Sequence, residues 1–124
     1  MRMWGWLWPP RESATGEVSV NGALQEKKVA VSASEIDLTQ GNLFTKTISG
    51  NTTFTVANTP ATGTVAAFIL ELTNGGSATV TWWSGMKWDD GLAPALTAAG
   101  RDVLGFYTHD GGTNWLGFKA GQNL

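Results

Sequence analysis

Cysteine is absent from this 124-residue chain, and histidine and tyrosine occur once each. Without thiols the chain has no disulfide, no thiolate zinc site and no cysteine nucleophile, so we expect an intracellular site of synthesis. Charged residues make up only 15% of the sequence, the formal net charge is -2, and the lysines and arginines are scattered. A nucleic-acid-binding protein normally carries a basic patch, so we expect no nucleic-acid partner.

Long apolar runs are also missing. No stretch approaches the roughly 18 continuous apolar residues of a membrane span. The opening run MRMWGWLWPP is too short for the apolar core of a secretory signal peptide. We therefore expect a soluble protein with no membrane partner.

Sequence motifs of enzymes are lacking as well. The chain contains no GxSxG, HExxH, Walker-type or GxGxxG pattern. His109 stands beside Asp110, but neighbours in a strand point to opposite faces, and Asp before Gly is typical of a turn. Asp89 and Asp90 precede Gly91 and fit a polar turn better than a calcium site, which needs about six oxygens. We expect no enzyme, and no catalytic, cofactor-binding or metal-binding residues.

Tryptophan, in contrast, is abundant at the start of the chain. Trp4, Trp6 and Trp8 alternate, so an extended segment places the three indoles on one side. Each indole buries roughly 150–250 Å² when it is enclosed, and such an exposed patch marks an interaction site. We predict that this segment docks on a partner protein through Met3, Trp4, Trp6, Leu7 and Trp8; folding back on its own subunits is the alternative.

The rest of the chain is typical of β-structure. Residues 1–16 form the predicted docking segment and linker, and residues 17–124 form one predicted domain of short alternating strands. Gly50-Asn51, Asn74–Ser77 and Asp110–Thr113 are turn sequences that predict three hairpins between neighbouring strands. Leu92 to Gly100 predicts a loop, because Pro94 interrupts it. We expect an all-β fold, an antiparallel β-sandwich of jelly-roll type, with an extended N-terminal anchoring segment. The expected strands are 28–34, 35–39, 43–49, 52–57, 65–73, 78–83, 103–109 and 114–120.

A second group of aromatic residues lies within the domain. Flat rings near loop tips can stack on sugars, and buried rings can pack in a core or between subunits. Trp82 and Trp83 are consecutive, so alternation leaves at most one of them free for a ligand. We treat Trp83, Trp88, Tyr107 and Trp115 as candidates for ligand or subunit contact.

Three stretches together resemble a domain found repeatedly in structural proteins of tailed bacteriophages. They are IDLTQGNLFTKTISGNTTFTVANTPATGT, FILELTNGGSATVTWWSGMKWDDGLAPALT and DVLGFYTHDGGTNWLGFKAGQNL. The shared features are a strand leading to a GNTT turn, a TVTW strand followed by KW and a G-x-x-P-x-L-T loop, and a final D-G-T-x-W hairpin. The resemblance covers about Glu35 to Leu124. Trp83 stands where the family pattern has proline, and the tryptophan segment is not part of the pattern.

The resemblance implies a β-sandwich without enzymatic activity that is a building block of a virion and often trimeric. We therefore expect a capsid- or tail-attached decoration or spike protein, anchored by its tryptophan segment to phage capsid or tail proteins. It would be made in the host cytoplasm and reside in the virion, as a homotrimer. The alternative is a tail-fibre or receptor-binding module that recognises host-surface glycans through its ring side chains.

Overall fold

The computed structural model describes residues 16–124, so the predicted docking residues Met3, Trp4, Trp6, Leu7 and Trp8 lie outside the described part. Within that range the chain forms strands and two single 3-10 turns, and none of its helical turns is long and apolar enough to cross a membrane. The prediction of an all-β fold is confirmed. In chain order the elements are β2 (Lys28–Ala30), β3 (Glu35–Asp37), β4 (Leu43–Thr47), β5 (Thr52–Thr53), β6 (Thr55–Ala57), β7 (Ala66–Thr73), η1 (Gly75–Ser77), β8 (Val80–Thr81), β9 (Met86–Lys87), η2 (Asp89–Gly91), β10 (Arg101–Thr108) and β11 (Trp115–Gly121).

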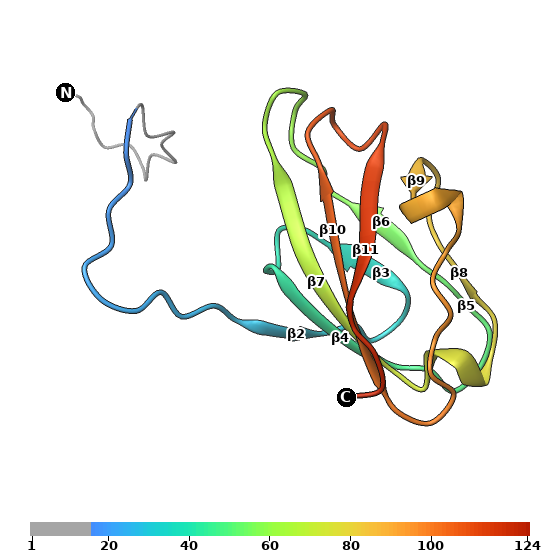
Figure 1. Ribbon diagram of the computed structural model, residues 1–124. Coiled ribbons are helices and arrows are strands. Elements are labelled where there is room, and N and C mark those ends of the chain that lie inside the picture. Colours follow the sequence, from blue (N-terminus) through green and yellow to red (C-terminus); the bar gives the residue numbers. More distant parts are fainter. Residues whose placement is uncertain (1–15) are drawn as a thin grey trace.

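The main sheet has six strands in the order β2-β4-β7-β10-β11-β9 (Figure 1). Its centre is antiparallel, because β10 pairs in that sense with both β7 and β11. The flanking pairs β2–β4, β4–β7 and β11–β9 are parallel, and so are the two small sheets β3–β6 and β5–β8. The sheets are therefore mixed, and the antiparallel arrangement that we expected throughout is limited to β7, β10 and β11.

Of the three predicted hairpins, the last is confirmed. Strands β10 and β11 pair on either side of the turn at Asp110–Thr113, with Tyr107 opposite Leu116. Gly111 and Gly112 have φ angles of 72° and 89°, a backbone conformation that glycine adopts without steric cost. The turn sequence therefore specified this hairpin locally.

The first predicted hairpin, across Gly50-Asn51, is wrong. Strand β4 pairs with β2 and β7 in the main sheet, whereas β5 and β6 lie in the two small sheets. The side-chain oxygen of Asn51 accepts a hydrogen bond from the Thr79 amide at 2.9 Å, which directs the chain towards β8. Gly50-Asn51 thus carries the chain from the main sheet to the opposite layer.

The second predicted hairpin, between residues 65–73 and 78–83, is also wrong. Asn74 takes a left-handed conformation and η1 follows it, after which β8 pairs with β5. The Gly76 amide donates to the Thr97 carbonyl at 3.0 Å, so this turn packs against the 92–100 loop. That loop contains no strand or helix, as expected from Pro94.

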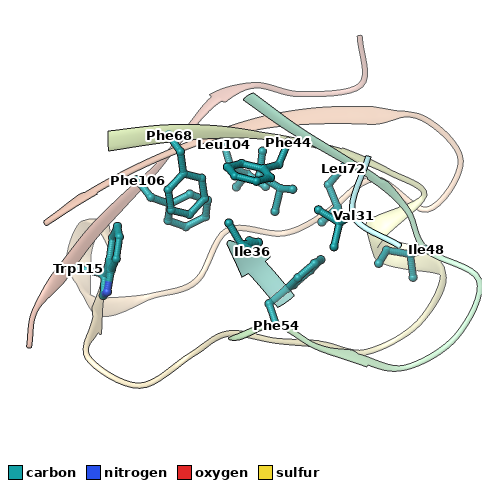
Figure 2. Packing of buried hydrophobic residues seen from close by; sticks show 11 residues of the cluster. Val31, Ile36, Phe44, Ile48, Phe54, Phe68, Leu72, Leu104, Phe106 and Trp115 are labelled. Atoms are coloured by element: carbon teal, nitrogen blue, oxygen red, sulfur yellow. The ribbon is translucent and has the colours of Figure 1, made fainter. Parts of the chain in front are cut away.

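The hydrophobic core lies between the main sheet and the two small sheets. Figure 2 shows Phe44, Phe68 and Leu104 reaching from the main sheet towards Ile36 and Phe54 on the other side. Each fully buried side chain of this size contributes roughly 1.5–3 kcal/mol to folding. The core residues are Val31, Ile36, Phe44, Ile48, Phe54, Phe68, Leu70, Leu72, Leu104, Phe106 and Trp115.

Candidate functional site

The face of the main sheet that points away from the core is apolar over half of its extent. Along β7 and β10, alternate residues such as Leu70 and Leu104 are fully buried, and the residues between them point outward. The strand register places Leu43, Ile69, Gly105 and Phe118 in one row across β4, β7, β10 and β11. We call this apolar half of the sheet surface the outer face.

A second row extends the outer face towards the β10–β11 turn. Ala67, Tyr107 and Leu116 are neighbours in it, and Ala120 lies beyond Phe118 on β11. Ile69 is 42% exposed and Phe118 is 50% exposed, which is unusual for such large side chains at the centre of a sheet. The outer face is hollowed into a groove of about 660 Å³, which Ile69, Tyr107 and Phe118 line together with Leu24, Glu26 and Lys28.

The floor of the groove depends on Gly105. A Cβ atom at this position would lie within 2.6 Å of the far edge of the Phe118 ring. The absence of a side chain therefore lets the ring lie flat across β10. The result is a smooth apolar surface that another sheet or an extended segment could cover.

The other half of the same sheet surface is polar. Thr45, Thr47, Glu71, Thr73 and Arg101 line a smaller hollow of about 260 Å³ there. The sheet surface thus has a sharp division, with apolar residues gathered at one end. Such a segregated patch marks an interaction site more clearly than scattered exposed apolar residues do.

The aromatic candidates from the sequence divide between the core and the surface. Trp115 is 1% exposed, with its ring edge-on to Phe68 at 5.6 Å and to Trp83 at 5.8 Å. A sugar cannot stack on a ring enclosed in this way, so Trp115 is a core residue and its candidacy as a ligand contact is not supported. Trp83 is half-buried and its indole N–H is buried without an acceptor.

Trp88 and Tyr107 also differ in how far they are buried. Trp88 is half-buried, and its ring packs edge-on to Trp82 at 5.3 Å and to Phe106 at 5.6 Å. Tyr107 points outward from β10, is 37% exposed and lines the groove. Of the four candidates, Tyr107 is therefore the one that belongs to the outer face.

The two polar pairs considered from the sequence, His109–Asp110 and Asp89–Asp90, lie in turns. Asp110 accepts hydrogen bonds from the Asn114 amide at 3.0 Å and the Asn114 side chain at 2.9 Å, and also from the Thr108 hydroxyl. These bonds lower the pKa of Asp110 to about 2. His109 is exposed, and Asp89 and Asp90 form η2 on the surface. In residues 16–124 no three acidic, histidine or cysteine side chains gather as metal ligands would.

Three residues of the outer face, Leu43, Ile69 and Phe118, were not identified from the sequence. A signal was present in β7, where the continuous run AAFIL predicted a strand covered on both faces. A second signal lies in β11, where Trp115 and Phe118 give large apolar side chains to both faces. Among residues 16–124 the second of these faces stays partly exposed at Ile69 and Phe118.

Comparison of the chain with family models, with curated proteins and with solved structures finds no match.

Proposed function

We propose that the protein is a structural component of a bacteriophage virion, a capsid- or tail-attached decoration or spike protein. The observation that carries the proposal is the outer face, a broad apolar surface suited to protein contact. Its centre consists of Leu43, Ile69, Gly105 and Phe118, none of which supplies a nucleophile, acid or base. The resemblance of residues 35–124 to phage structural domains supports the virion as the setting.

In this proposal the tryptophan segment is the anchor. Burying three indoles of roughly 150–250 Å² each, at about 25 cal/mol per Å², supplies several kcal/mol before ordering costs. In this proposal the domain is a β-sandwich of jelly-roll type, and the resemblance implies a homotrimer. Three linked anchors bind with avidity, so a modest contact per chain gives stable attachment.

The test uses particles of the phage that encodes the chain. Full-length protein and the Trp4→Ala/Trp6→Ala/Trp8→Ala variant are expressed during infection, and purified particles are quantified by mass spectrometry. Wild type is expected on the particles, and the variant is expected at about 100-fold lower occupancy because its anchoring area is lost. Leu92→Ala, in an exposed loop at 73% exposure, is the matched control and keeps full occupancy. Particles that carry variant and wild type equally, or that carry neither, overturn the proposal.

The glycan-binding alternative gains little from the domain. Trp115 is enclosed in the core, and Trp83 and Trp88 are packed against neighbouring rings. Binding of the full chain to host polysaccharide, lost on Tyr107→Ala, would replace the decoration proposal with a receptor-binding one.

A further inference from the structure

The segment before β2 carries a second set of exposed apolar side chains next to the groove. Residues 17–27, here called the arm, precede β2 and are exposed throughout. Val18 and Val20 alternate with polar residues, and Leu24 follows a bend at Asn21-Gly22, where Gly22 has a φ of 122°. Their exposed fractions are 76%, 55% and 71%. Before the bend, the extended stretch that carries Val18 and Val20 has one apolar side, like a strand that buries one face.

The base of the arm is fixed at the groove. Glu26 accepts a hydrogen bond from the Asn42 side chain at 3.0 Å, and Leu24 and Glu26 line the groove. From there the arm runs away from the body of the domain, as the blue segment of Figure 1 shows. Val18 and Val20, on this segment, are exposed to solvent.

We propose that the arm of one copy lies across the outer face of a second copy of this chain. Both surfaces are apolar, both belong to every copy, and within residues 16–124 both keep large exposed apolar side chains, Val18 and Val20 on the arm and Ile69 and Phe118 on the outer face. This proposal rests on the homotrimer of the proposed function and gives it a contact surface. It involves no residue of the tryptophan segment, so it can fail while the anchor holds, and the anchor can fail while it holds.

The dimensions of the two surfaces agree with this arrangement. The apolar halves of β4, β7, β10 and β11, at about 4.8 Å spacing and over about four residues each, give a face of about 19 by 13 Å. That area of about 250 Å² is about a third of the roughly 800 Å² that each partner contributes to a stable interface. The arm spans at most about 36 Å when extended, so it can cross the neighbour's face, and its own buried surface adds to the contact.

Charge and sequence pattern also favour a second copy of the chain as the partner that covers the outer face. The net charge of -2 is small, so two copies repel each other weakly at physiological ionic strength. The apolar run of β7 is typical of a strand covered on both faces, yet Ile69 is 42% exposed among residues 16–124, and the arm of a second copy would supply the second cover.

The absence of cysteine makes a direct test simple. Full-length Val20→Cys and full-length Ile69→Cys are mixed and treated with a bis-maleimide linker. We expect adducts of one chain of each kind, at least tenfold more than with Thr47→Cys. Thr47 is the matched control because it is exposed on the polar half of the same sheet surface. Equal yields from Ile69→Cys and Thr47→Cys overturn the proposal, and so does a Val20→Cys/Ile69→Cys double variant that links only within one chain.

Sedimentation velocity supplies the second measurement. Wild type is expected to contain two or more copies, and Ile69→Asp to dissociate at least tenfold more readily, whereas Thr47→Asp does not. The variant Val18→Asp/Val20→Asp/Leu24→Asp changes only exposed arm residues, so it tests the contact without disturbing the core, and we expect it to dissociate as well. A monomeric wild type at tens of micromolar overturns the proposal. It is equally overturned if Trp4→Ala/Trp6→Ala/Trp8→Ala dissociates while the arm variant does not, because the groove would then hold the tryptophan segment.

Discussion

Replacing Asp102 with asparagine tests how the end of the chain and the 92–100 loop are held to the main sheet. Asp102 lies in β10 and is 0% exposed. One carboxylate oxygen accepts the Thr97 amide at 2.6 Å, and the other accepts the Thr97 hydroxyl at 2.8 Å and the Asn123 amide at 2.9 Å. This single side chain therefore joins two segments that form no strand of their own.

The size of the effect follows from these three bonds. A hydrogen bond to a charged group contributes about 1.5–3 kcal/mol, and a buried donor left without a partner costs about 1–3 kcal/mol. Asparagine has the same shape but only one acceptor oxygen, so its NH₂ group meets an N–H or O–H donor. We expect Asp102→Asn to lower the free energy of unfolding by about 3 kcal/mol at pH 7.

The effect also depends on pH. Burial raises the pKa of Asp102, but the amides of Thr97 and Asn123, the Thr97 hydroxyl and the charge of Lys119 together lower it below its ordinary value. A carboxyl with a lowered pKa in the folded state contributes fully above its unfolded pKa of about 3.9. The contribution is lost as the pH falls through the folded pKa, so the difference between wild type and Asp102→Asn shrinks in acid.

Urea unfolding followed by tryptophan fluorescence measures this difference. With an m-value of about 2 kcal/mol/M, a loss of about 3 kcal/mol moves the midpoint down by about 1.5 M at pH 7. Asp89→Asn, in the exposed η2 turn, is the control and leaves the midpoint unchanged. Equal midpoints for wild type and Asp102→Asn at pH 7 would refute the reasoning, and so would a difference that stays constant between pH 7 and pH 2.

Three further predictions follow from single positions. Gly76→Ala should lower the free energy of unfolding, measured in urea, by about 2 kcal/mol or more, because its Cβ would overlap the Leu96 carbonyl oxygen. Gly50→Ala, with open space around it, is the control and should change the free energy of unfolding by no more than about 0.5 kcal/mol. Equal losses of stability in the two variants would contradict the packing. Trp83→Phe should change the free energy of unfolding by less than about 1 kcal/mol, since it removes a buried donor that has no acceptor along with ring area; a larger loss means that the N–H is hydrogen-bonded. The Asp110 carboxyl should titrate at about 2 by NMR, so that its contribution to stability is full above pH 4 and lost as the pH falls towards 2; titration near 4 would rule out the turn hydrogen bonds.

Local signals in the sequence predicted the elements better than their pairing. The β10–β11 hairpin follows from Gly111 and Gly112, because a tight turn fixes the register of the two strands that it joins. The Gly50-Asn51 turn has equally good residues but does not form a hairpin. Phe54 explains the difference, since it is fully buried on the opposite side of the core and stacks on Trp82 at 5.8 Å.

The parallel strand pairs could not be predicted from the local sequence. Thr52 pairs with Val80, and Leu43 pairs with Ile69, so each pairing depends on where the intervening chain runs. Turn residues between consecutive strands carry no information about such contacts. The outer face was missed for the same reason, because Leu43, Ile69 and Phe118 meet only after β4, β7 and β11 have been placed in one sheet.

The arm connects the two interaction surfaces that we propose. If it crosses the outer face of a neighbouring copy, the start of each arm, to which the proposed anchor is joined, lies at that neighbour's surface rather than at its own. The anchors are then held together by the assembly, and their effective concentration is set by the geometry of the oligomer rather than by the length of a free linker. Val18→Asp/Val20→Asp/Leu24→Asp leaves the tryptophans intact. It should therefore weaken attachment to particles through loss of avidity alone, whereas full particle occupancy by this variant would show that the anchor acts without the assembly.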